Sequence, residues 1–185
     1  MTALVPFLFF CQVFGAFVGA FTTLWGEIAY VRAMRDGTID EAERAHLRII
    51  ARGLRFGMSL ILLSSLGLVV VAYALKEALQ PALSAGYWIS ISLALLIIGV
   101  SWALSRQRVS FALGSALVFT AWWFLAYLTI GWLPPLSFGA AVAYYVVVAA
   151  LMYALLAFAR FIVLDSTPRQ GDEASDKHRL AQKLK

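Results

Sequence analysis

Five long apolar runs dominate this sequence and limit what it can fold into. They cover residues Leu4 to Val31, Leu54 to Leu75, Tyr87 to Leu104, Val109 to Leu133 and Leu136 to Leu164. Each is long enough for a helix to cross a hydrocarbon layer of about 30 Å. A backbone in lipid must satisfy its own N–H and C=O groups, and barrel strands would instead alternate over about ten residues. The sequence therefore predicts an all-α integral membrane bundle of five transmembrane helices, forming a single domain over residues 1–164.

The composition agrees with a bilayer environment. Hydrophobic residues make up 62% of the 185 residues and charged residues 14%, whereas a soluble domain has about 45–50% and about 25%. A water-soluble core of this size cannot hide so much apolar surface. Membrane lipids are therefore the first expected partners.

The basic residues predict the orientation of the bundle. They lie in the first and third connections, at the end of the last run and in the polar tail over residues 165–185, and Lys76 is the only one of the 15 Lys and Arg residues on the other side. Because such residues collect on the cytoplasmic face, we expect the amino terminus outside and the carboxyl terminus inside a bacterial cytoplasmic membrane. The formal charge of +5 follows from this topology, and we expect no nucleic-acid partner.

The first connection contains a helix signal of its own. Asp36 and Gly37 are typical of a turn, and Thr38 with Glu41 forms a capping box. The spacing predicts a short interfacial helix over residues 38–52 that leads into the second span.

Glu27 is the only acid inside an apolar run. A charge at mid-membrane costs about 2.5–3.5 kcal/mol on insertion scales. Arg160 lies at a similar depth in the last run, so an ion pair is open to it, and a structural role is the favoured interpretation. In the functional alternative, Glu27 joins Gln12 and Thr23 in a polar cavity that binds a proton, an ion or a head group.

Three glycines in the first run, Gly15, Gly19 and Gly26, form a stripe of small residues. Such stripes let another helix approach closely, and packing is favoured over a ligand slot. The facing helix is either internal or supplied by a second copy or another membrane protein, and the sequence leaves these alternatives open.

Aromatic residues concentrate in the last two runs, with Trp122, Trp123, Tyr127 and Tyr145 as candidates for a pocket. Together they can enclose a flat apolar ligand such as a quinone or pigment. Packing between helices remains the favoured interpretation.

Signals for metals, cofactors and catalysis are missing from the sequence. His46 and His178 are the only histidines, and both lie outside the runs. This pattern argues against a haem held between two histidines and against a zinc cluster. There is also no nucleophile motif or phosphate loop, so we predict no metal site and no catalytic residue, and the sequence leaves unknown whether a cofactor is bound.

A stretch from Gln12 to Glu27, followed by Arg35, Asp36 and Gly37 and an arginine-rich entry to the second run, resembles a group of small uncharacterised bacterial multi-pass membrane proteins. The resemblance covers about residues 12–70. That group is distantly similar to copper-resistance-D-like membrane bundles, in which a histidine early in a span can bind haem. Gln12 stands at that position here, so the resemblance implies topology rather than haem binding.

These features favour a non-enzymatic accessory or small-ligand-binding subunit of the membrane. The alternative is a redox or transport protein that holds a quinone, haem or small solute within the bundle. A third interpretation is a catalytic site for lipid head groups, built from Glu27, Arg160 and arginines of the cytoplasmic connections.

Overall fold

The computed structural model describes residues 3–36, 41–76, 80–132 and 136–165, and this part of the chain is helical apart from its connections. The elements are α1 (Leu4–Asp36), α2 (Glu41–Ala74), a single turn of 3₁₀ helix η1 (Pro81–Leu83), α3 (Ala85–Ser105), α4 (Phe111–Ile130) and α5 (Phe138–Asp165). Each of the five α-helices is long and apolar enough to cross a membrane. The predicted all-α class is therefore confirmed, and so is the presence of five helices with the length and hydropathy of membrane spans. The tail predicted over residues 165–185 lies outside the described residues beyond Asp165.

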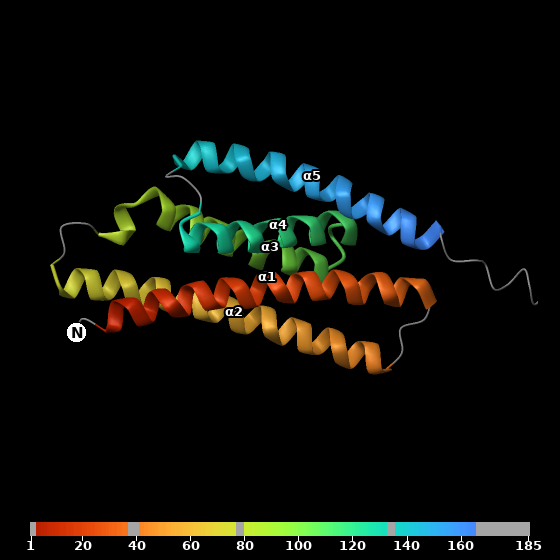
Figure 1. The fold of residues 1–185 in the computed structure, drawn as a ribbon, viewed down its shortest axis with the longest axis horizontal. Helices are drawn as coiled ribbons and strands as arrows, with labels where there is room; N and C mark the ends of the chain where they lie inside the picture. The colour runs from red at the N-terminus through yellow and green to blue at the C-terminus, as the bar shows by residue number, and fades with distance from the viewer. Residues whose placement is uncertain (1–2, 37–40, 77–79, 133–135, 166–185) are drawn as a thin grey trace, which may run out of the picture.

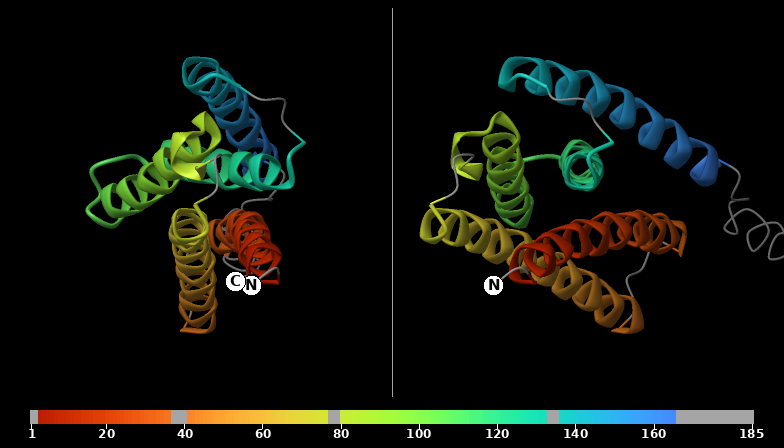
Figure 2. Two further views of the ribbon diagram at one scale, coloured as in Figure 1. Left: turned by 90° about the vertical axis from the view of Figure 1, so that its left-hand side faces the viewer. Right: turned by 60° about the vertical axis from the view of Figure 1, so that its left-hand side comes forward.

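Helix α4 is the centre of the bundle. It packs against α1, α3 and α5, while α1 and α2 form a closely packed pair on one side (Figure 1). Helix α5 runs along the outside (Figure 2). In the most apolar 18-residue stretch of α4, 50% of the residues are buried, whereas only 17% are buried in the corresponding stretch of α5. Helix α5 is therefore attached to the bundle by a narrow seam.

Local signals set the ends of the inner helices. The Ser84 hydroxyl accepts a hydrogen bond from the Tyr87 N–H at the start of α3, and Ser110 does the same for Leu113 at the start of α4. Each serine thereby satisfies an N–H that has no partner within its helix. Helix α4 ends at Gly131, whose φ of 77° is a left-handed conformation that glycine adopts without a steric penalty.

The chain between the first two spans differs from the prediction. The expected interfacial helix over 38–52 is not separate, because residues 41–52 belong to the same continuous helix as the second span, Glu41–Ala74; residues 38–40 lie outside the described part. Helix α1 likewise extends beyond the apolar run to Asp36. The physical reason is that charged residues mark the edge of an apolar layer, whereas a helix continues until its backbone hydrogen bonding is interrupted.

The glycine stripe of α1 packs inside the protein. A Cβ on Gly15 would lie 2.8 Å from the carbonyl oxygen of Gly57 in α2, and a Cβ on Gly19 would overlap the indole ring of Trp122 in α4. A Cβ on Gly26 would make only ordinary contact, at 3.5 Å from Ile50. Of the partners that the sequence left open, the internal one is therefore present at Gly15 and Gly19, and these buried glycines offer no surface to a second copy.

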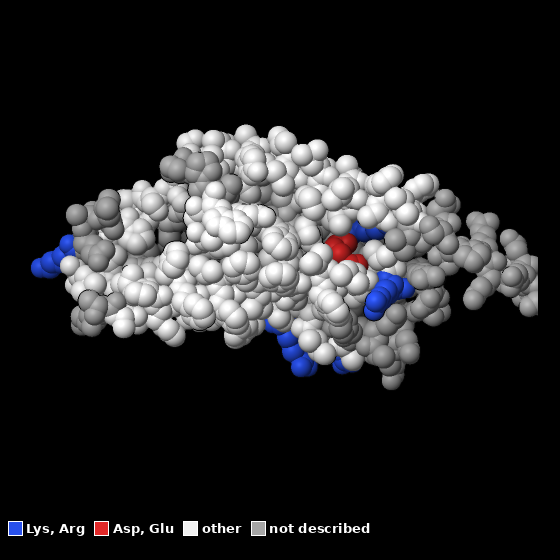
Figure 3. Space-filling view, viewed as in Figure 1, with Lys and Arg blue, Asp and Glu red and all other residues white. Residues whose placement is uncertain are grey.

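The outer surface of the bundle carries few charges. Figure 3 shows a largely uncharged face on which acidic atoms occur at one place, beside basic atoms. Large apolar side chains are more than half exposed along the helices, among them Phe7, Phe10, Leu63, Leu66, Phe158 and Phe161. Such a surface is suited to contact with lipid rather than water.

Candidate functional site

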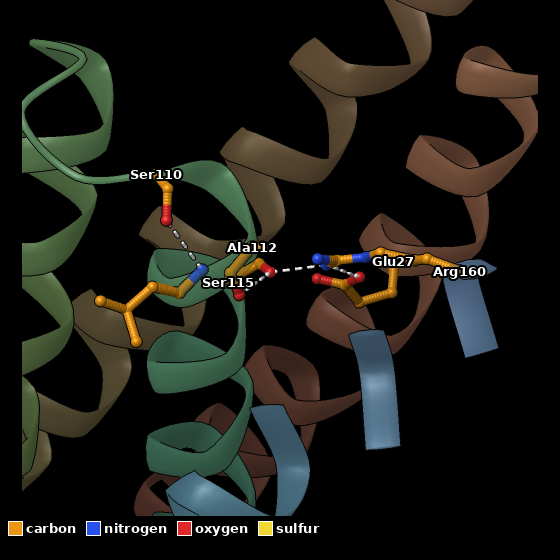
Figure 4. A network of polar contacts seen from close by, with 6 residues as sticks. Glu27, Ser110, Ala112, Ser115 and Arg160 are labelled. Atoms are coloured by element: carbon orange, nitrogen blue, oxygen red, sulfur yellow. Dashed lines mark hydrogen bonds and ion pairs between the residues drawn. The ribbon is translucent and has the colours of Figure 1, made fainter. Parts of the chain in front are cut away.

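Three helices meet at a polar cluster made of Glu27 in α1, Ser115 in α4 and Arg160 in α5. The Nη2 atom of Arg160 donates to Glu27 Oε2 at 2.6 Å and to Ser115 Oγ at 2.7 Å (Figure 4). The Ser115 hydroxyl in turn donates to the Ala112 carbonyl at 3.3 Å, so its lone pairs face the guanidinium. The ion pair left open by the depth of Glu27 and Arg160 in the sequence is therefore present.

Two aromatic rings cover the arginine of the polar cluster. The Cζ atom of Arg160 lies 5.3 Å from the ring centre of Tyr30 and 5.5 Å from that of Phe111, and the two rings stack on each other at 3.9 Å. Both are within the range of cation–π attraction. The rings and the ion pair leave the side chains of Arg160 and Glu27 only 12% and 11% exposed.

The chemistry of the polar cluster favours a structural role. Each charge is neutralised by the other, and breaking a buried ion pair is costly because one charge is left without its partner. Among the described residues, no group of three or more His, Cys, Asp or Glu side chains is placed to hold a metal ion. The cluster thus fastens α5 to α1 and α4.

The other two members of the predicted polar cavity donate hydrogen bonds to groups other than Glu27. Gln12 donates to the Ser65 hydroxyl of α2 at 3.1 Å and lines a pocket of about 220 Å³. It precedes Glu27 by fifteen residues, or about 22 Å along a helix. The Thr23 hydroxyl donates to the Ala20 carbonyl of its own helix at 2.7 Å.

A larger cavity lies between α4 and α5. This α4–α5 groove has a volume of about 650 Å³ and is open on one side. Its nine described lining residues are Phe119, Thr120, Trp123, Phe124, Tyr127, Trp132, Tyr144, Val148 and Met152. None of these nine is charged, and six carry aromatic rings, so the groove is suited to a neutral and largely apolar ligand.

Aromatic rings form a continuous wall along the groove. The ring centre of Trp123 lies 6.3 Å from that of Tyr127, which lies 5.7 Å from that of Trp132. Across the groove, the rings of Phe124 and Tyr144 are 5.7 Å apart. These separations are typical of packed aromatic pairs, and the wall presents ring faces and edges that a flat ligand can contact.

Two of the four aromatic residues singled out from the sequence do not line this groove. Trp122 is fully buried on the side of α4 that faces α1. The Tyr145 hydroxyl donates to the Leu117 carbonyl at 3.0 Å, and its side chain lines a separate apolar pocket of about 220 Å³. Trp123 and Tyr127 do line the groove, because residues four apart lie on the same face of a helix.

Seven lining residues were not among the four candidates for the pocket: Phe119, Thr120, Phe124, Trp132, Tyr144, Val148 and Met152. A signal for four of them exists, since residues 119, 123 and 127 in α4 and residues 144, 148 and 152 in α5 are each spaced by four. The sequence-based candidates were all aromatic, so Thr120 and the two aliphatic lining residues, Val148 and Met152, were overlooked.

Two polar atoms of the groove residues lack partners. Thr120 is 2% exposed, and neither its Oγ1 atom nor the Nε1 atom of Trp123 has a hydrogen-bond partner within the described residues. Buried polar groups normally find partners. The groove is therefore apolar in bulk, and two of its lining residues each carry a buried polar atom without a partner among the described residues.

Searches with family models, of curated proteins and of solved structures each find no match to this chain. The resemblance over residues 12–70 thus stays a prediction, and the functional argument rests on the geometry alone.

Proposed function

We propose that this chain is a non-enzymatic, multi-pass protein of the bacterial cytoplasmic membrane that binds a neutral, largely apolar ligand in the α4–α5 groove. The observation that carries the proposal is the groove itself, with a volume of about 650 Å³ and no charge among its nine described lining residues. Small-molecule sites typically have volumes of about 300–1,000 Å³ and mostly apolar walls with a few polar groups. The groove meets each of these criteria.

The surroundings of the bundle support placement in a membrane. The five long apolar helices and the exposed apolar side chains require a solvent that does not hydrogen-bond. The distribution of Lys and Arg favours a cytoplasmic carboxyl terminus and an outer amino terminus. In this setting the open side of the groove faces lipid, and its ligand enters laterally from the membrane.

A redox or transport role is the second candidate. It is favoured by the aromatic rings on six of the nine described lining residues of the groove, which suit a flat ligand such as a quinone. A haem is the least supported cargo, because the only histidines, His46 and His178, lie outside the predicted spans. Catalysis on lipid head groups is not favoured either, since Glu27 and Arg160 neutralise each other.

Ligand retention tests the proposal. The protein would be transferred from its native membrane into lipid nanodiscs and weighed by native mass spectrometry, and any bound molecule would then be extracted. We expect a bound species in the wild type and its loss in Val148→Trp, because the larger side chain fills the groove. Val147→Trp is the matched control, since Val147 is 58% exposed and does not line the groove. Absence of a bound species in the wild type, or equal retention by both variants, would contradict the proposal.

A further inference from the structure

Two exposed arginines meet at one tryptophan near the end of α3. The Cζ atom of Arg106 lies 5.1 Å from the ring centre of Trp102, and that of Arg108 lies 5.2 Å from the same centre. Both distances are within the range of cation–π attraction. The two cations are thus held at most about 10 Å apart, and an anion that binds beside them lowers their mutual repulsion.

The backbone after α3 fixes this arrangement. Gln107 has a φ of 54°, and its N–H donates to the Leu104 carbonyl at 3.0 Å. The Arg108 N–H donates to the Ala103 carbonyl, also at 3.0 Å. This is the hydrogen-bond pattern of a Schellman motif, which reverses the chain at the end of a helix. The reversal brings Arg108 back beside the last turn of α3, where Trp102 lies.

The two arginines are not neutralised within the described residues. Both are exposed, and neither side chain makes a hydrogen bond or an ion pair there. Arg160 differs, because Glu27 pairs with it. The N–H donors of Arg106 and Arg108 are therefore available to an external anion, and a guanidinium can bind a phosphate through two parallel hydrogen bonds.

An apolar strip leads from Trp102 into the membrane. Ile98 and Leu95 precede Trp102 by four and seven residues, and a helix brings side chains at this spacing to one face. All three are at least 45% exposed. Trp102 lies three residues before the end of α3, near the boundary at which tryptophan meets the lipid head groups. The surface therefore combines a cationic end at this boundary with an apolar length beside the acyl chains.

On this basis we infer that Arg106, Arg108 and Trp102 form a site for the phosphate group of an anionic phospholipid, whose acyl chain lies along the strip of Ile98 and Leu95. The connection after α3 is on the predicted cytoplasmic side, where anionic lipids attract basic residues. A lipid suits the surface better than free phosphate does, because only a lipid also covers the apolar strip.

This site is separate from the α4–α5 groove. None of its residues is among the nine described lining residues of the groove, so the inference goes beyond the proposed function and does not depend on it. Arginines at a membrane boundary commonly reach the head groups without forming a site. The exposed Arg52 and Arg55 of α2 provide that comparison, since the Arg55 Nε donates to the Ala51 carbonyl of its own helix.

Lipid binding to the purified full chain tests the inference. Native mass spectrometry in a non-ionic detergent would measure the dissociation constant of phosphatidylglycerol. Phosphatidylcholine with the same acyl chains is the matched lipid without net charge. We expect phosphatidylglycerol to bind more tightly to the wild type, and equal dissociation constants for the two lipids would overturn the inference.

Paired variants locate the bound lipid. Arg106→Gln with Arg108→Gln should weaken phosphatidylglycerol binding by about tenfold or more, from about fivefold for each charge near a membrane surface, and leave phosphatidylcholine binding unchanged. Arg52→Gln with Arg55→Gln removes the same charge from the same predicted side and should weaken it less than about twofold, since distant exposed charges are screened. Equal weakening by both pairs would indicate diffuse attraction and overturn the inference.

Two variants of Trp102 test the ring. Trp102→Leu keeps an apolar side chain without a ring for the arginines, and we expect it to weaken phosphatidylglycerol binding by about two- to fivefold. Trp102→Phe keeps a ring and should recover most of the affinity. Unchanged binding in Trp102→Leu would overturn the assignment of the ring to the site.

Two further outcomes identify the ligand and its place. Excess inorganic phosphate should not displace phosphatidylglycerol, and displacement would overturn the lipid in favour of free phosphate. Val148→Trp, which fills the α4–α5 groove, should bind phosphatidylglycerol as the wild type does. Loss of binding in that variant would place the lipid in the groove and overturn the site at Trp102, while the proposed function would stand.

Discussion

The two sides of α4 are built from the same kinds of residue and differ in how they close. Toward α1 and α2, the indole of Trp122 fills the space left by Gly19 and contacts Gly57. Toward α5, the next residue, Trp123, borders a groove of about 650 Å³. The comparison teaches that an aromatic side chain seals an interface only where the facing helix provides room for its ring.

Helix α5 has one row of residues that packs against the bundle and a neighbouring row that does not. Ala141, Tyr145 and Ala149 are buried and form the seam that holds α5 to the bundle. The neighbouring row of Tyr144, Val148 and Met152 lines the groove instead. The two alanines permit close approach along the first row, where the Tyr145 hydroxyl also donates to Leu117 of α4. The second row has a side chain larger than alanine at all three positions.

The largest expected difference between the two sides of α4 is in the stability lost when each of the neighbouring tryptophans is replaced by alanine. Trp122→Ala leaves a large internal cavity, and we expect it to lower the free energy of unfolding by about 3–5 kcal/mol. Trp123→Ala should lower the free energy of unfolding by less than half as much, because the Trp123 side chain already borders an open groove. Unfolding in mixed micelles with increasing SDS measures both, and equal losses would contradict the distinction.

The polar cluster should contribute almost as much as the tryptophan of the core. Arg160→Gln leaves the buried Glu27 without its cation, and we expect a loss of about 3–5 kcal/mol in the free energy of unfolding. The double variant Glu27→Gln with Arg160→Gln has no unpaired charge and should recover most of the loss. If the double variant were as unstable as the single one, the ion pair would not be what fastens α5.

The glycine stripe predicts an intermediate effect. Gly19→Ala places a methyl group against the Trp122 ring, and overpacking of this kind costs about 1–3 kcal/mol. Gly26→Ala is the matched control on the same helix, because its Cβ meets Ile50 at an ordinary 3.5 Å. The same SDS titration should show a loss for the first variant only, and a loss in both would indicate general sensitivity of α1.

The smallest expected effect separates the two tyrosines of α5. Tyr145→Phe removes the hydrogen bond to Leu117. We expect it to lower the free energy of unfolding by about 0.5–1.5 kcal/mol and to lower the thermal midpoint accordingly. Tyr144→Phe changes a residue that lines the groove and should leave the thermal midpoint unchanged. A larger shift in Tyr144→Phe would place the groove within the stabilising core.

The spans and the Glu27–Arg160 pair could be predicted because length, hydropathy and depth are readable along the chain. The sequence did not predict which face of each helix packs against the core. Helix α4 is apolar all round, so no amphipathic pattern shows which side faces the core and which faces α5. Whether Trp122 or Trp123 is enclosed depends on the glycines of α1 and α2 opposite, and periodicity within one helix does not reveal its neighbour.

One paired measurement tests the account most directly: the thermal midpoint and the amount of retained ligand, determined on the same preparations of Trp122→Phe and Trp123→Phe. The account predicts that Trp122→Phe lowers the midpoint and keeps the ligand, because only the core is disturbed. It predicts that Trp123→Phe keeps the midpoint and retains less ligand than the wild type. Loss of ligand in Trp122→Phe at an unchanged midpoint, or the same behaviour in both variants, would contradict the division of α4 into a packed face and a binding face.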